Sequence, residues 1–176
     1  YYSYLGTDAL VIPKNEQTMN LEKFTVSTAE SEWMRVVPHE AGHALGCPHE
    51  HQRREIIDRL DHAKVMAYHK KWYGWSAQET REQVLTPLEE SSIMATPEAE
   101  ATSIMAYDFP ASLTKDGVAI PGGKGLTDLD FQFMAKMYPV VGGPPPTDGF
   151  PSTFRLSGDI GGHHYEGVFH EVPSAS

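Results

Sequence analysis

One short stretch of the chain has residue types and a spacing that suit metal chemistry. It reads His39-Glu-Ala-Gly-His-Ala-Leu-Gly-Cys-Pro-His49, which is the pattern H-E-x-x-H-x-x-G-x-x-H. Imidazole nitrogens are good zinc ligands, and three protein ligands with a free fourth position are typical of a catalytic zinc site. A carboxylate beside such an ion can accept a proton from an attacking water. We therefore predict a zinc hydrolase in which His39, His43 and His49 bind Zn²⁺ and Glu40 is the general base.

The backbone around these residues must bring three side chains to one point. His39 and His43 are four residues apart, so a helix places them on the same face, one turn from each other. Gly46 can take positive φ at little cost and so can end that helix. Pro48 opposes further helix. The chain is therefore expected to turn after the second ligand and to return His49 to the metal.

The residues beyond the third histidine extend the pattern. Glu50 follows it directly, Arg53 comes three positions later, and Glu55 comes two after that. Downstream, Ser-Ile-Met-Ala-Tyr occupies positions 103–107. Together these segments resemble the metzincin metalloendopeptidases, and within them the astacin-like family. The departures are Glu55, where the family usually has aspartate, and Ala106, where its Met-turn usually has histidine.

The resemblance assigns roles to two residues that would be read as core packing if taken alone. It implies that Met105 forms an apolar floor beneath the zinc without binding it. It also implies that Tyr107 is a fifth, displaceable ligand that swings away to stabilise the transition state. A phenol is chemically suited to this, because it can bind metal as phenolate or donate a hydrogen bond to an oxyanion.

The same resemblance implies an α+β fold of the metzincin type. A small mixed sheet, with the active-site helix above it, would belong to a partial upper subdomain at 1–46. A mostly helical or irregular lower subdomain would follow at 47–139, to complete a catalytic domain at 1–139. A Pro/Gly linker is expected at 140–151 and a C-terminal tail at 152–176.

Strands are expected at the N-terminus. Residues 2–6 resemble a family strand, and residues 8–12, which are rich in aliphatic side chains, are predicted to form the next strand, the sheet edge along which substrate lies. Only 38 residues precede His39. Relative to the family the chain is therefore expected to be shortened at its N-terminus.

Most of the remaining regular structure is expected to be helical. Their signals are apolar periodicity and capping residues, such as Ser76 with Glu79 in capping-box register. The segment 110–124, rich in Gly and Pro, is expected to be a loop that walls the substrate pocket. The predicted helices cover about 29–45, 61–73, a segment opening at Ser76, and a C-terminal helix capped by Thr127 or Asp128 and ended by Pro139.

The other potential ligands receive simpler interpretations. Cys47 is the only cysteine, so no intrachain disulfide is possible, and its place in the motif's turn favours packing. The remaining histidines are predicted to be surface or helix-face residues, or at most adventitious metal binders in the tail. These are His51, His62, His69, His163, His164 and His170.

The composition of the chain argues against some classes of binding partner. The chain has 176 residues and a formal net charge of −10, which argues against nucleic acid as a natural partner. No apolar run approaches the length needed to span a membrane. We expect a monomer, which a missing N-terminal segment could complete, acting on a protein or peptide substrate. Secretion is implied by the family resemblance alone.

The favoured interpretation is a zinc-dependent endopeptidase, and two other functional classes stay open. One is a zinc-binding pseudoprotease or interaction module without hydrolysis, which would have no need of Glu40. The other is a zinc hydrolase of non-peptide esters or amides, which the two family signatures together disfavour. A structural zinc site is a further alternative, but such sites usually close with cysteine or a fourth protein ligand.

Overall fold

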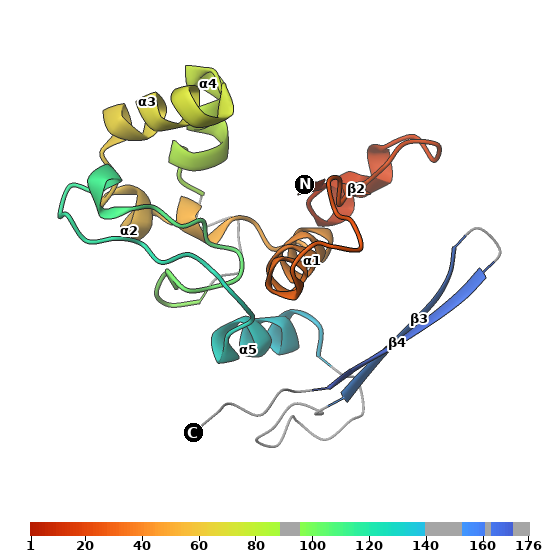
Figure 1. The fold of residues 1–176 in the computed structure, drawn as a ribbon. Helices are drawn as coiled ribbons and strands as arrows, with labels where there is room; N and C mark the ends of the chain where they lie inside the picture. The colour runs from red at the N-terminus through yellow and green to blue at the C-terminus, as the bar shows by residue number, and fades with distance from the viewer. Residues whose placement is uncertain (89–95, 140–152, 161–162, 171–176) are drawn as a thin grey trace. The chain divides into compact units, whose positions relative to one another are not determined.

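The structure is a computed structural model that describes residues 1–88, 96–139, 153–160 and 163–170. The chain divides into two units, Tyr1–Met137 and Tyr138–Ser176. The predicted linker lies outside the described residues. In the described part, no helix is both long and apolar enough to cross a membrane. Figure 1 shows that the first unit consists of short helices joined by long irregular segments.

The N-terminal segment departs from the two predicted strands. Strand β1 is only Tyr2–Ser3, and it pairs antiparallel with β2, Met19–Asn20, so the expected mixed sheet is a two-stranded antiparallel one. The predicted strand at 8–12 is wrong, because Gly6–Val11 form the 3-10 helix η1. Gly6, at φ +48°, turns the chain there, and no neighbouring strand pairs with these aliphatic residues among those described. Leu10 and Val11 are 81% and 82% exposed instead.

Helix α1, Glu30–Ala44, confirms the predicted helix and ends as its sequence requires. Gly46 has φ +91°. Its N–H donates to the His43 carbonyl, and the Cys47 N–H donates to the Gly42 carbonyl. These two bonds form the Schellman motif, in which a left-handed glycine satisfies the last free carbonyls of a helix. The backbone is therefore fixed where it turns at the end of α1, and His49 follows three residues after Gly46.

The larger hydrophobic core lies among the short helices that follow α1. These are α2 (Arg54–Ile57), α3 (His62–Tyr73), α4 (Ala77–Thr80) and the π-helical segment η3 (Arg81–Leu85). Ser76 and Glu79 form the predicted capping box at the start of α4. The buried residues of this core are Ile56, Leu60, Val65, Val84, Leu85, Phe109, Leu113 and Ile120.

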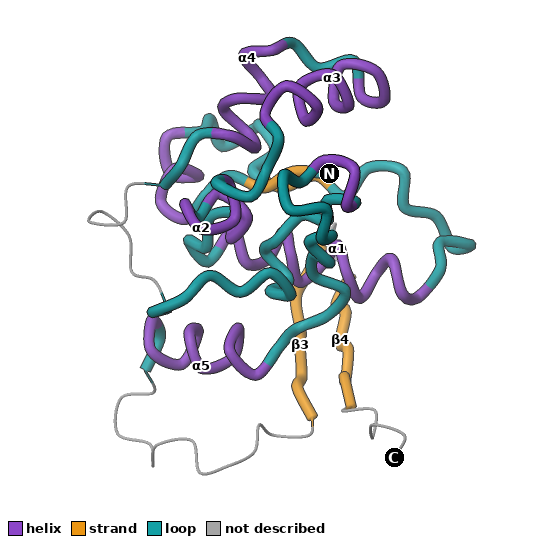
Figure 2. The backbone as a smooth tube through the Cα atoms, turned by 90° about the vertical axis from the view of Figure 1, so that its left-hand side faces the viewer, coloured by secondary structure: helices purple, strands orange, loops and turns teal. Residues whose placement is uncertain are grey.

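Loops bring residues 103–107, the second segment of the family resemblance, to the histidine motif at 39–49. Figure 2 shows that loop conformation predominates in the described residues that precede α5, Asp128–Met137. The 3-10 helix η5, Ala111–Leu113, interrupts this loop, and the bridge between Phe109 and Ile120 folds it back on itself. The predicted Thr127 cap is confirmed, because its hydroxyl accepts the Asp130 N–H at 3.1 Å.

The second unit contains a β-hairpin that the sequence analysis did not predict. Strand β3, Thr153–Ile160, pairs antiparallel with β4, His163–His170. The register places Thr153 opposite His170 and Ile160 opposite His163. All three tail histidines therefore belong to β4.

Candidate metal centre

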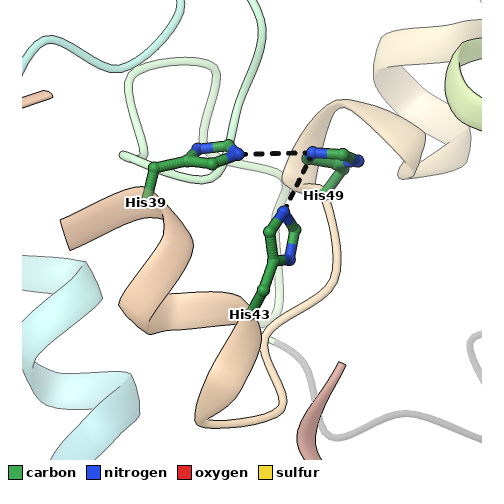
Figure 3. A group of neighbouring side chains, drawn as sticks. All are labelled: His39, His43 and His49. Carbon is green, nitrogen blue, oxygen red and sulfur yellow. Dashed lines mark hydrogen bonds between the residues drawn. The ribbon is translucent and has the colours of Figure 1, made fainter. Parts of the chain in front are cut away.

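Three imidazole rings converge where α1 meets the segment that follows it (Figure 3). Nε2 of His49 lies 3.3 Å from Nε2 of His39 and 3.1 Å from Nε2 of His43. One ligand atom from each ring lies within 4.8 Å of the others. The predicted turn thus brings the third histidine back to the first two, as the spacing required.

Backbone contacts determine which nitrogen of two rings faces the centre. Nδ1 of His39 lies 2.7 Å from the Ile104 carbonyl, and Nδ1 of His43 lies 2.8 Å from the Cys47 carbonyl. A carbonyl only accepts, so each Nδ1 carries the proton and donates it. In the neutral ring Nε2 is then left with a free lone pair directed at the centre. Such a contact at the far nitrogen is typical of metal-binding histidines.

The donor set and its spacing fit a zinc ion. Ligands at a Zn–N distance of about 2.0–2.1 Å in tetrahedral geometry lie about 3.3–3.4 Å apart, close to the two separations measured from Nε2 of His49. Burial also favours the neutral, ligating form of the rings. It lowers the pKa of His39 to about 4, and it lowers the pKa of His43 and of His49. Protons therefore compete weakly for these nitrogens at neutral pH.

Glu40 lies beside the triad as an incompletely satisfied carboxylate. The residue is buried, and its Oε2 atom has no hydrogen-bond partner among the described residues. Burial raises the pKa of this carboxyl group, while the N-terminal ammonium and Arg35 oppose the shift. A buried acceptor oxygen without a partner costs stability unless water or a ligand occupies the space in front of it.

A cavity of about 580 Å³ opens next to Glu40 and His39. Its walls include Tyr107 and several residues of the segment predicted to wall the pocket. Two cationic residues, Arg35 and Lys124, and one acidic residue, Asp108, also line it. The cavity is therefore a cleft with both charged and apolar walls, in which a bound group could reach Glu40 and His39.

Met105 is buried against α1 between the first two histidines. A Cβ atom built on Gly42 would lie 2.4 Å from Met105 Sδ, so the sulfur occupies the space that a side chain would need. Cys47, the residue predicted to pack, is buried in the same cluster with Ile104 and Met105, and Phe133, Met134 and Met137 of α5 cover them. The predicted Met-turn, residues 103–107, thus packs directly against α1, the helix that carries His39 and His43.

Tyr107 lies beside the third histidine. Its ring centroid is 4.5 Å from that of His49 and 6.1 Å from that of His39. Burial, followed by the nearby charge of Glu40, raises the pKa of the Tyr107 phenol to about 12. The group is therefore a protonated hydrogen-bond donor at neutral pH when no cation is bound.

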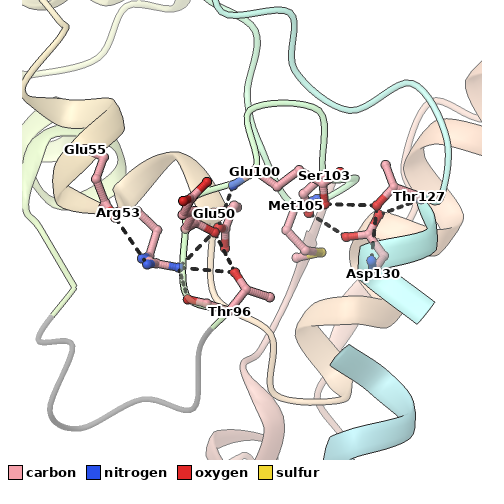
Figure 4. A network of polar contacts seen from close by, with 10 residues as sticks. Glu50, Arg53, Glu55, Thr96, Glu100, Ser103, Met105, Thr127 and Asp130 are labelled. Carbon is pink, nitrogen blue, oxygen red and sulfur yellow. Dashed lines mark hydrogen bonds and ion pairs between the residues drawn. The ribbon is translucent and has the colours of Figure 1, made fainter. Parts of the chain in front are cut away.

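The predicted motif extension forms a polar network that holds the Met-turn (Figure 4). Arg53 is buried and lies 3.4 Å from both Glu50 and Glu55. The Glu50 N–H donates to the Met105 carbonyl at 3.0 Å. From α5, Asp130 accepts the Ser103 hydroxyl at 2.6 Å and the Ile104 N–H at 3.1 Å. The segment 103–107 is thus hydrogen-bonded on one side to Glu50 and on the other to Asp130 of α5.

The predicted surface position of His51 is wrong. Its side chain is 0% exposed and stacks on Tyr107. His62 is exposed as expected, and His69 lies on α3 with Nδ1 donating to the Val65 carbonyl at 2.9 Å. Among the described residues, the one group of histidine, cysteine and acidic side chains placed to hold a metal is the predicted triad. Only the close spacing of His51 to His49 could have suggested its place near the centre.

Comparison with known proteins identifies relatives among solved structures. No protein-family model and no curated protein matches the chain. One structure of myroilysin is 38% identical, with a TM-score of 0.75, and the alignment covers 79% of this chain and 68% of that one. A second has the same identity, a TM-score of 0.51 and coverage of 79% and 61%. The chain therefore belongs to the same family as the metalloprotease myroilysin.

Proposed function

We propose that the chain is a secreted, zinc-dependent endopeptidase of the astacin-like metzincin type. In this proposal His39, His43 and His49 hold Zn²⁺, and Glu40 is the general base. One observation carries it: the Nε2 atoms of His39 and His43, each with a free lone pair, converge with Nε2 of His49, and buried Glu40 nearby has a carboxylate oxygen with no hydrogen-bond partner among the described residues. Family membership with myroilysin supports the same assignment.

A zinc ion bound there would supply Lewis-acid chemistry, making water more acidic and polarising the substrate carbonyl. Glu40 Oε2, which has no hydrogen-bond partner among the described residues, accepts the proton of the attacking water. A carboxyl group whose pKa is raised by burial can hold that proton and then deliver it to the leaving amine. The chain's own contribution is thus a proton carrier held close to the scissile bond.

Tyr107, which lines the same cavity as Glu40, contributes a hydrogen-bond donor. Its phenol keeps its proton at neutral pH because burial holds the pKa near 12. It can therefore donate a hydrogen bond to the oxygen on which negative charge develops. Met105 remains an apolar support behind the ligands, in contact with the α1 backbone at Gly42.

The test is proteolysis of casein or gelatin, with cleavage sites mapped by mass spectrometry and metal content measured in parallel. We expect cleavage that a chelator abolishes and zinc restores. Glu40→Gln and Glu40→Ala should lower kcat by about 10²–10⁴-fold. Glu16→Gln, on an exposed residue of the N-terminal segment, should behave as wild type. Undiminished activity of Glu40→Ala would eliminate the general-base role.

Two further measurements separate the alternatives. Tyr107→Phe should fold normally and lower kcat more than it raises KM, because the phenol acts mainly in the transition state. A wild-type protein that is folded and zinc-loaded but cleaves no protein would instead favour the interaction module. Loss of any one of the three histidines should weaken zinc binding severely in either case.

A further inference from the structure

His51 is the most completely buried polar residue near the proposed active site, and the mechanism above gives it no role. It lies in the 3-10 helix η2, Glu50–Gln52, two residues after the third histidine. Its side chain has 0% exposure. It does not belong to the triad of potential metal ligands.

Both ring nitrogens of His51 are occupied by backbone groups from distant segments. The Tyr107 N–H donates to Nδ1 at 3.2 Å. Since Nδ1 accepts, the ring proton lies on Nε2, which donates to the Gln83 carbonyl at 3.2 Å. His51 thus connects η3 to the Met-turn at the residue that carries the proposed catalytic phenol.

The face of the same ring sets the position of the phenol. His51 stacks on Tyr107 at 4.2 Å between centroids, with 22° between the ring planes. His49 lies 4.8 Å away at 35°, and Phe109 meets the ring nearly edge-on at 5.7 Å. The Tyr107 ring thus packs against the rings of both His51 and His49.

We propose that His51 is a positioning residue that holds the Tyr107 backbone and ring in place over the metal centre. This inference rests on the proposed function, because its consequence is expressed through Tyr107. Phenylalanine at position 51 would keep a flat ring but would leave the Tyr107 N–H and the Gln83 carbonyl unpaired. Asparagine could accept the N–H but has no ring face. Imidazole provides both contacts at once.

The first test is a double-mutant cycle on kcat and KM. His51→Phe should lower kcat by at least about 10-fold, with KM changed by less than about twofold. In the Tyr107→Phe background the same substitution should lower kcat little further, because its effect passes through the phenol. If the double variant lowered kcat by the full product of the two single effects, the proposal would be overturned.

His69→Phe is the matched control. His69 is also buried, also contacts a backbone carbonyl, and also stacks on an aromatic ring, Trp75, at 5.2 Å and 26°. It makes none of these contacts with Tyr107. His69→Phe should therefore lose stability comparably and keep kcat. An equal loss of kcat in His69→Phe would assign the effect of His51→Phe to general destabilisation.

The second test needs neither zinc nor activity. Hydrogen–deuterium exchange of the metal-free chain should show faster exchange at the Tyr107 amide in His51→Phe, with partial protection restored in His51→Asn. His69→Phe should leave this amide protected. Wild-type protection in His51→Phe would overturn the contact itself. If the zinc-loaded wild-type chain cleaves nothing, the proposed function fails, and the exchange result still decides whether His51 holds Tyr107.

Discussion

The contact between Gly42 and Met105 leads to a quantitative prediction for Gly42→Ala. The new Cβ would lie 2.4 Å from Met105 Sδ and 3.3 Å from its Cε. Met105 is buried, so its side chain has little room to move away. Such overpacking costs about 1–3 kcal/mol, and the better helix propensity of alanine offsets about 1 kcal/mol of it. We expect a net loss of unfolding free energy of up to about 2 kcal/mol.

A double-mutant cycle isolates the clash from the propensity gain. In the Met105→Ala background the sulfur is absent, so Gly42→Ala should stabilise the chain by about 1 kcal/mol. The coupling between the two sites should therefore be about 1–3 kcal/mol. The assay is equilibrium unfolding of the metal-free chain in urea, followed by circular dichroism. Gly125→Ala is the control, because a Cβ there meets nothing within 4 Å.

The same substitution should weaken the metal centre. Ile104, next to Met105, supplies the carbonyl that orients the His39 ring. Displacing the turn should lower zinc affinity by about 10-fold or more, as the loss of such orienting contacts usually does. Competition with a chromophoric chelator measures this directly. The packing argument is refuted if Gly42→Ala matches Gly125→Ala in stability and is additive with Met105→Ala.

Three other perturbations follow from the network around the centre. Asp130→Ala removes the acceptor for Ser103 Oγ and should cost about 2–3 kcal/mol in urea unfolding, whereas an unchanged midpoint would show that the turn holds itself. Arg53→Met leaves partly buried Glu50 without its cation and should cost up to about 3 kcal/mol, partly recovered by adding Glu50→Gln; no recovery would contradict the charge explanation. Because burial lowers the pKa of His39 to about 4, the unfolded chain takes up its proton first as pH falls. His39 alone should therefore cost the metal-free chain about 3 kcal/mol between pH 6.5 and pH 4. His43 and His49, whose pKa burial also lowers, add to this loss, and a flat profile measured by unfolding at several pH values would refute the reasoning.

Local rules were sufficient to predict that three histidines converge in a group that could hold a metal. Two histidines four residues apart share a helix face whatever surrounds them. A glycine that can adopt positive φ ends the helix through two backbone bonds within the same segment. The triad could therefore be predicted from His39, His43, Gly46 and His49 alone. The Ser76 and Thr127 caps are predictable for the same reason, since each contact spans three residues.

Contacts between distant segments decided what the sequence could not. The aliphatic run at 8–12 suits a strand, but a strand forms only with a partner, and β1 pairs with β2 instead. His51 is buried because Gln83 and Tyr107, 32 and 56 residues away, supply partners for its two nitrogens. No local spacing encodes those separations. Residue types and short-range periodicity thus determined which groups could bind a metal. Long-range packing alone determined that His51 is buried against Tyr107.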